Sequence, residues 1–261
     1  MREIPVVAER GEITDRNGTV LAGNRTSYAV FLRARAVEDA EYTATVLSEI
    51  LECDRAELLS KINGGRVSEI TVARHAEREK IEKLCEYDLS GVYFSRDNTR
   101  VYPYGELLCQ VLGFTSTDNS GTTGIEKYYD RYLSGENGEL LYETDLVGVD
   151  LAGAVAAYVP ATDGLNVELT VDYEIQAIAE SVMRTAYETY SAASAQCIVL
   201  DPQTFEILAM VNYPSYDLND VPRDDPDTLN ALTRNSLVSD IYEPGSTFKI
   251  VTAAANIEEY L

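Results

Sequence analysis

The stretch RGEITDRNGTVLA, residues 10–22, places a turn signal between two short apolar runs. Asn17 and Gly18 stand between these runs, and both residue types accept the positive φ that a tight hairpin turn requires. The stretch therefore predicts a β-hairpin near the start of the chain. Working outward, SYAVFLRA at residues 27–34 predicts a further strand.

Short helices and strands alternate in the segments that follow. An amphipathic pattern predicts helices at residues 37–52, 54–63 and 77–87, with Asp54 as the N-cap of the second helix. EITVARHA at residues 69–76 predicts a strand, and residues 90–117 predict short aromatic-rich strands broken by Pro103 and Gly105. Residues 124–138 predict one helix closed by a Gly/Asn loop. This mixture predicts an α+β fold.

A domain boundary is predicted near Pro160, Asp163 and Gly164, which are turn residues. We therefore expect domains at residues 1–163 and 164–261. In the second domain, VELTVD at residues 167–172 predicts a strand. The helix pattern at residues 173–190 predicts one buried apolar stripe, formed by Ile175, Ile178, Ala179, Val182 and Ala186. Residues 195–201 and 205–212 predict a hairpin at the centre of a sheet, followed by a polar loop at residues 213–230.

The composition excludes several classes of function. The chain has 261 residues, 45% of them hydrophobic, and its 21 basic and 44 acidic residues give a net charge of −23, which disfavours nucleic acid as a partner. Its four cysteines lie far apart and its one histidine, His75, has no second histidine at ligand spacing, so we expect no metal, no cofactor and four buried, unpaired cysteines. No apolar run is long enough for a membrane helix, and as given the chain is expected to be soluble.

The segment EPGSTFKIVTAAA, residues 243–255, contains the only S-x-x-K of the chain, Ser246 and Lys249. The run from Ser246 onward is compatible with a helix that carries Phe248, Val251, Thr252 and Ala255 on one face. One interpretation is that Ser246 only caps this helix. The other is acyl transfer, with Ser246 as nucleophile at a helix N-terminus and Lys249, one turn away, as its base when removed from water.

YEPGSTFK, residues 242–249, resembles the active-site signature of the class B penicillin-binding proteins, the D,D-transpeptidases of peptidoglycan synthesis. Five further stretches resemble family motifs in the family's order, so the resemblance covers almost the whole chain. They are Arg10–Ala22, Arg100–Phe114, Gly121–Gly138, Leu169–Gln176 and Ile207–Asn219. The resemblance implies a pedestal or dimerisation domain at residues 1–163 and the first part of a serine β-lactamase-like transpeptidase domain at residues 164–261.

By this resemblance, Ser246 attacks the penultimate D-alanine carbonyl of a stem peptide ending in D-Ala-D-Ala, and Lys249 acts as general base. A β-lactam imitates that end and traps Ser246 as an acyl-enzyme. The chain departs from the family pattern at Phe205, where the family usually has glycine, and the S-x-N and K-T-G motifs are not found. We therefore expect these 261 residues to be inactive alone, with exposed sheet edges that favour self-association.

The resemblance also implies a location and a partner for the intact protein. The location is the extracytoplasmic face of the bacterial cell membrane, and the partner is a membrane cell-wall polymerase that contacts the pedestal. Two alternatives stay open at this point. The chain could belong to a scaffold or β-lactam sensor of the same family that never turns over, or to a serine β-lactamase, which ordinarily lacks a pedestal.

Overall fold

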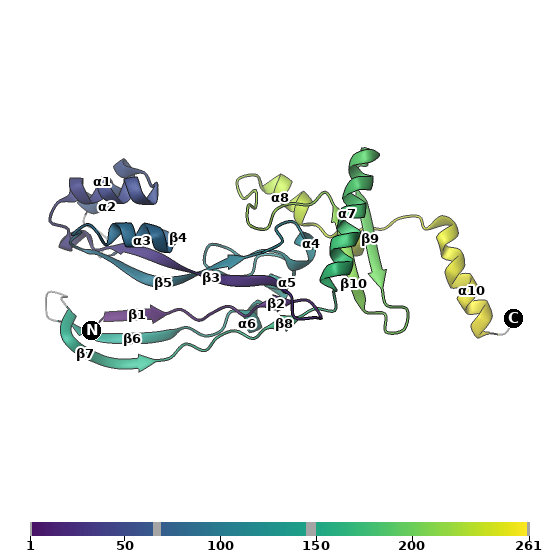
Figure 1. The fold of residues 1–261 in the computed structure, drawn as a ribbon, viewed down its shortest axis with the longest axis horizontal. Helices are drawn as coiled ribbons and strands as arrows, with labels where there is room; N and C mark the ends of the chain where they lie inside the picture. The colour runs from purple at the N-terminus through teal and green to yellow at the C-terminus, as the bar shows by residue number, and fades with distance from the viewer. Residues whose placement is uncertain (1, 65–68, 145–149, 260–261) are drawn as a thin grey trace.

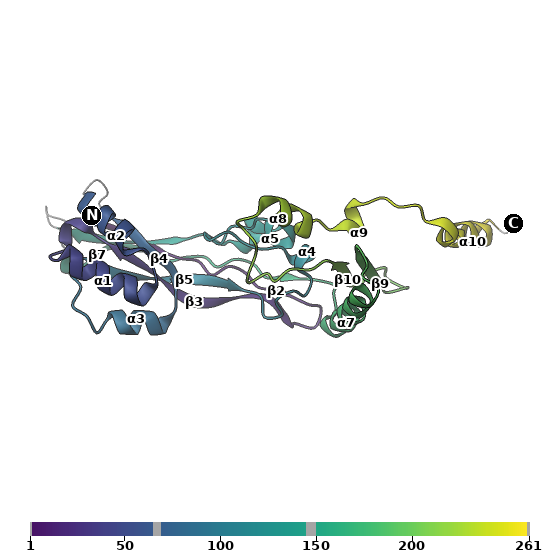
Figure 2. The same cartoon turned by 90° about the horizontal axis from the view of Figure 1, so that it is seen from above.

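Two sheets run along the long axis of the molecule in the first two thirds of the chain (Figures 1 and 2). The computed structural model describes residues 2–64, 69–144 and 150–259. One sheet has the antiparallel order β1-β6-β7, and the other has the order β4-β3-β2-β8, with β5 also paired to β3. The strands are β1 (Arg2–Val6), β2 (Ile13–Thr14), β3 (Val20–Leu32), β4 (Ile70–Ala76), β5 (Val92–Val101), β6 (Gly138–Thr144), β7 (Asp150–Val159) and β8 (Val167–Glu168).

Helices pack on the end of the β3–β5 sheet that lies away from the C-terminus. They are η1 (Ala34–Ala36), α1 (Ala40–Leu51), α2 (Arg55–Gly64) and α3 (Arg78–Leu84). Leu47 of α1, Leu84 of α3 and Leu32 of β3 are almost fully buried in one apolar cluster. The Asp54 side chain accepts a hydrogen bond from the Glu57 N–H at 2.8 Å, which confirms the predicted N-cap of α2.

The hairpin predicted at residues 10–22 is present as β2 and β3, with Ile13 opposite Ala22. Its loop is longer than a two-residue turn, and of the two central residues only Gly18 has a positive φ, of 85°. The Asp15 carboxylate closes this loop, because its Oδ1 accepts hydrogen bonds from the N–H groups of Asn17 and Thr19 at 2.9 and 2.7 Å.

Two predictions for the middle of the chain are wrong in detail. Residues 90–101 contain a single long strand, because β5 pairs with β3 without a break from Val101 opposite Gly23 to Val92 opposite Leu32. The strand is followed by the short helix α4 (Cys109–Leu112). The single helix predicted before the Gly/Asn loop of residues 124–138 is divided at Tyr129, whose ψ of 14° leaves the helical region, into α5 (Gly124–Tyr128) and α6 (Asp130–Leu133).

In the last third of the chain, α7 (Tyr173–Thr189) packs on an antiparallel hairpin of β9 (Ala195–Leu200) and β10 (Ile207–Tyr213). The fully buried Gln176 side chain joins the two layers, since it donates to the Met210 carbonyl at 3.0 Å and accepts from the Met210 N–H at 2.8 Å. Because α7 packs through this polar position, the predicted buried stripe is wrong: Ile178 is 67% exposed and Val182 is 61% exposed.

The chain beyond β10 becomes progressively less packed. Its elements are α8 (Pro226–Thr233), α9 (Ser236–Ser239), the 3₁₀ turn η2 (Gly245–Phe248) and α10 (Lys249–Glu258). The predicted polar loop at 213–230 is partly wrong, because Tyr216 and Leu218 are buried and α8 begins at Pro226. Both views show α10 extending away from the other elements (Figures 1 and 2).

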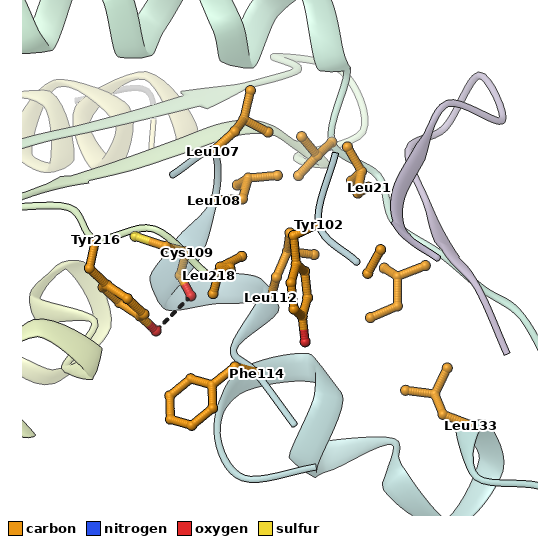
Figure 3. Packing of buried hydrophobic residues seen from close by; sticks show 13 residues of the cluster. Leu21, Tyr102, Leu107, Leu108, Cys109, Leu112, Phe114, Leu133, Tyr216 and Leu218 are labelled. Carbon is orange, nitrogen blue, oxygen red and sulfur yellow. Dashed lines mark hydrogen bonds between the residues drawn. The ribbon is translucent and has the colours of Figure 1, made fainter. Parts of the chain in front are cut away.

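One apolar core joins the residues on both sides of the predicted domain boundary (Figure 3). Leu21, Leu112 and Phe114 come from before the boundary, and Tyr216 and Leu218 come from after it. The Tyr216 hydroxyl also donates to the Cys109 carbonyl oxygen at 3.2 Å. The two halves of the chain are therefore packed against each other rather than linked by a solvated segment.

The cysteines are all unpaired, as expected, but the prediction that all four are buried is wrong. Cys109 is buried, Cys53 and Cys197 are half-buried, and Cys85 is exposed. Within the described ranges, no three histidine, cysteine, aspartate or glutamate side chains converge closely enough to hold a metal ion.

Phe205, where the resemblance described above leads us to expect glycine, adopts a φ of 61° in the β9–β10 turn and is 74% exposed. A left-handed conformation costs a side-chain-bearing residue about 1–2 kcal/mol, whereas glycine adopts it freely. We expect Phe205→Gly to raise the free energy of unfolding by about 0.5–1 kcal/mol in urea denaturation. Gln203→Gly, at a nearby position without positive φ, is the control and should be destabilising; equal effects of the two substitutions would contradict the prediction.

Candidate active site

Ser246 lies in the 3₁₀ turn η2, directly before α10 begins at Lys249. Gly245 precedes it with a φ of 56°, a conformation that glycine allows at low cost. The Lys249 backbone N–H donates to the carbonyl oxygens of Ser246 and Thr247, so the serine and the lysine are held one tight turn apart. The turn places the serine at the N-terminal end of a ten-residue helix, where unpaired N–H groups favour negative charge.

The interpretation of Ser246 as a helix cap has no support in the geometry. Neither η2 nor α10 has a side-chain cap hydrogen bond at its first residue, and the residues at the two cap positions are Pro244 and Phe248. The hydroxyl that does bond in this turn is that of Thr247, which donates to the Pro244 carbonyl. Ser246 is therefore not required to start the helix.

The segment that carries both residues is exposed. Every described residue from Val238 to Glu259 is exposed, and Phe248 and Val251, predicted to share one helix face, are 57% and 55% exposed. Within the described part of the chain, the side chains of Ser246 and Lys249 make no hydrogen bond or ion pair. A lysine acts as a base only when uncharged, and burial favours that form, so the described residues supply the spacing but not the dry environment.

A buried ionic cluster in the pedestal, which the motif analysis missed, is centred on Glu126 of α5. The Glu126 side chain is 0% exposed and accepts from Arg10 Nε at 2.8 Å and from Arg100 Nε at 2.7 Å. Arg10 Nη1 also contacts Asp130 at 2.7 Å, and the Tyr102 hydroxyl lies 3.3 Å from Glu126 Oε1. Three motifs, at residues 10–22, 100–114 and 121–138, thus meet at one carboxylate.

Other motif residues connect the pedestal to the last third of the chain. Asp15 Oδ2 accepts from the N–H of Tyr173, the first residue of α7, at 3.0 Å. The Asn219 side chain forms hydrogen bonds with both backbone groups of Tyr102, accepting from its N–H at 3.0 Å and donating to its carbonyl at 2.8 Å.

Burial by itself would raise the pKa of Asp15. The hydrogen bonds from the N–H groups of Tyr173, Thr19 and Asn17 have the larger combined effect, so the pKa lies below its ordinary value.

Glu180 on α7 forms another connection of this kind. Its Oε1 accepts from the Leu108 N–H at 2.9 Å and from Gln176 Nε2 at 2.8 Å, and Leu108 itself has a φ of 58°. Burial raises the pKa of Glu180 despite these hydrogen bonds. Most of these residues stand within the motifs described above, but their partners are distant in the chain.

The comparisons with known proteins agree with this architecture. The family model of the penicillin-binding protein dimerisation domain matches residues 5–169, and that of the penicillin-binding protein transpeptidase domain matches residues 195–260. Within the described ranges, no helix is long and apolar enough to cross a membrane.

Two curated relatives match nearly the whole chain. Stage V sporulation protein D of Bacillus subtilis is 38% identical over 260 residues, which are 99% of this chain and 40% of the relative. Peptidoglycan D,D-transpeptidase FtsI of Escherichia coli is 31% identical over 260 residues, which cover 95% of this chain and 42% of that relative. The chain therefore spans about two fifths of the length of these relatives.

Solved structures show the same fold. Penicillin-binding protein 2X of Streptococcus thermophilus has a TM-score of 0.60 and 25% identity, with 85% of this chain and 36% of that chain covered. The penicillin-binding protein PBP2 of Helicobacter pylori, solved in complex with MreC, has a TM-score of 0.72 and 23% identity. The match covers 98% of this chain and 53% of that chain.

Proposed function

Because the chain belongs to the class B penicillin-binding protein family, we propose that it supplies the pedestal and the nucleophile of a peptidoglycan D,D-transpeptidase. The observation that carries the proposal is the placement of Ser246 and Lys249 in one tight turn at a helix N-terminus, within the stretch that the transpeptidase family model matches. We also propose a division of the chain at residues 163 and 164. The end of the long strand β7 at Val159, followed by the turn residues Asp163 and Gly164, supports this division.

The proposed reaction proceeds in two acyl transfers. Lys249 Nζ takes the proton of the Ser246 hydroxyl, and Oγ bonds to the carbonyl carbon of the penultimate D-alanine. The peptide bond to the terminal D-alanine breaks, and that residue leaves as an amine after receiving the proton. The amine of a second stem peptide then attacks the acyl-serine, forms the cross-link and regenerates the serine. A β-lactam enters the first step and stays bound as an ester.

Acylation by penicillin tests the nucleophile. In a version of the protein that extends to the full length of the relatives, intact-mass measurement should find one covalent penicillin, and Ser246→Ala should abolish it. Ser239→Ala, at an exposed serine of α9, is the control and should leave the adduct unchanged. An adduct that survives Ser246→Ala would remove Ser246 from the mechanism, and no adduct on the unsubstituted protein would favour the scaffold alternative.

The 261-residue chain, tested beside the longer one, should react much more slowly. Loss of one oxyanion-hole donor alone typically costs a factor of about 10²–10³ in rate, and in the described residues Ser246 and Lys249 lie on an exposed segment. Equal rates of penicillin reaction in the two chains would contradict this expectation.

Self-association of the 261-residue chain is also proposed, with a second copy as the partner of the β9 edge. Among the described strands β9 pairs with β10 alone, and it exposes Ile198 by 39% and Leu200 by 47%. Sedimentation velocity should find a concentration-dependent dimer that Ile198→Lys weakens by at least tenfold. Thr189→Lys, which adds the same charge on α7, should not weaken it. A monomer at all concentrations would refute the proposal.

Family membership also supports a location and a partner for the intact protein. We place it at the extracytoplasmic face of the cell membrane, with a membrane cell-wall polymerase against the pedestal. Cell fractionation and in-cell cross-linking from exposed pedestal positions would check both, and cross-links to cytoplasmic proteins alone would contradict them.

A further inference from the structure

A cavity of about 540 Å³ lies where the pedestal sheet meets the segment that follows β10. Its walls come from β3, β4, the end of β5, residues 114–119 and residues 218–223. The volume is in the range of small-molecule sites, which occur preferentially between domains. It is far along the chain from Ser246 and has no part in the proposed acyl transfer.

The charge of the cavity is opposite to that of the protein. Its lining contains Arg25, Arg100, Arg223 and His75 but no aspartate or glutamate, although the chain has 44 acidic and 21 basic residues. Arg100 Nε is paired with Glu126, and Arg25 and Arg223 are the other two arginines of the lining. Carboxylates lie beside two of these groups, because Glu77 Oε1 is 3.6 Å from Arg25 Nη2 and Asp97 Oδ2 is 3.5 Å from His75 Nδ1. Within the described residues, Arg223 makes no ion pair, and the pair of Arg25 with Glu77 is long and exposed to solvent.

Hydrogen-bonding groups without partners line the same cavity. Arg25 and Thr99 are cross-strand partners in β3 and β5, so their side chains lie on one face of the sheet. Thr99 Oγ1 and Arg100 Nη2 are buried polar atoms that lack a hydrogen-bond partner, whereas His75 Nδ1 lies 3.5 Å from Asp97 Oδ2. His75 is fixed by its other ring nitrogen, Nε2, which lies 2.8 Å from the Thr117 carbonyl oxygen. Buried polar atoms without partners are uncommon, and two of them in one lining indicate a place for a polar ligand.

The remaining wall is apolar. Phe114 and Leu218 are buried members of the core at the junction, and Pro103 lies beside them in the lining. The Arg223 guanidinium lies 5.0 Å from the centre of the Phe114 ring and donates to the Thr115 carbonyl at 2.7 Å, which positions its remaining N–H groups.

We propose that this cavity binds a small organic anion, in which one carboxylate or phosphate group is attached to an apolar ring or short chain. Arg25, Arg223 and the Thr99 hydroxyl contact the oxyanion, and Phe114 and Leu218 contact the apolar part. Because its walls come from both halves of the chain, a bound ligand stabilises the junction between the pedestal and the segment after β10.

The chain contains a single histidine, so His75 gives one set of ring proton resonances at the cavity itself. These resonances should shift in a saturable way when phenylacetate or phenyl phosphate is added to the 261-residue protein at constant pH and ionic strength. The uncharged phenylacetamide should not shift them. Whichever of the two anions binds more tightly identifies the oxyanion that the site prefers.

Arg25→Gln should weaken binding of the preferred anion roughly tenfold, since a charge-assisted hydrogen bond is lost. Arg96→Gln is a matched control, because the side chains of Arg25 and Arg96 are both 63% exposed, both lie in the β3–β5 pair and each makes one surface ion pair. Melting temperatures of the two variants should equal that of the unsubstituted chain. Absence of shifts with both anions, equal shifts with phenylacetamide, or unchanged affinity in Arg25→Gln would overturn the proposal.

Discussion

Substituting glutamine for Glu126 is expected to lower the free energy of unfolding by about 3–5 kcal/mol and the melting temperature by roughly 10 °C. Glutamine keeps the size of the side chain and removes its charge. Arg100 then loses the one carboxylate among the described residues that contacts it, and the Gly11 and Asn24 oxygens that its guanidinium also contacts are neutral. Arg10 is less affected because Asp130 also contacts it.

The burial of the cluster makes this effect large. The side chains of Arg100 and Glu126 are 2% and 0% exposed, so water cannot replace the missing carboxylate. An exposed ion pair, by contrast, contributes about 0–1 kcal/mol. Glu82→Gln is therefore the control: its carboxylate pairs with Arg78 at 2.7 Å, but both side chains are more than 60% exposed.

Urea denaturation of both variants, followed by circular dichroism, measures the difference. Similar destabilisation by Glu126→Gln and Glu82→Gln would show that the buried cluster contributes no more than a surface pair. Adding Arg100→Met to Glu126→Gln should recover part of the lost stability, because it removes the uncompensated charge.

Local signals in the sequence predicted much of the fold. Asn17 and Gly18 indicated the β2–β3 hairpin, and Asp54 indicated the start of α2. Contacts between distant residues could not be predicted from one sequence. Arg10 and Glu126 are 116 residues apart, and nothing in either motif states that they meet.

The exposed stripe of α7 was mispredicted for a related reason. Periodicity shows that Ile178 and Val182 share a face, but not which face of the helix meets the β9–β10 hairpin. That choice depends on the long-range hydrogen bonds between Gln176 and Met210. Tertiary contacts of this kind have no local signature.

Some features of the candidate site could likewise be predicted from the sequence, and others could not. The spacing of Ser246 and Lys249 and the break at Gly245 were visible in the sequence, because they depend on residues adjacent in the chain. The 3₁₀ form of the turn and the exposure of the whole segment could not be predicted, because both depend on which other parts of the protein pack against this segment.

Replacing Lys249 by glutamine, in a version extended to the relatives' full length, is expected to slow acylation of Ser246 by penicillin about 10²–10⁴-fold. This is the usual contribution of a positioned general base. Glutamine is similar in length but cannot take the serine proton. The affinity for penicillin before acylation should change much less, because the proposed role of Lys249 is proton transfer.

Lys249→Arg separates proton transfer from simple charge. Arginine keeps a cation in this turn but stays protonated under all working conditions, so it cannot act as a base. If Lys249 is the base, stopped-flow acylation should be slowed as strongly in Lys249→Arg as in Lys249→Gln. If Lys249 only provides positive charge near the developing oxyanion, arginine should preserve most of the rate, and the assignment of Lys249 as general base would then fail while Ser246 remained the nucleophile.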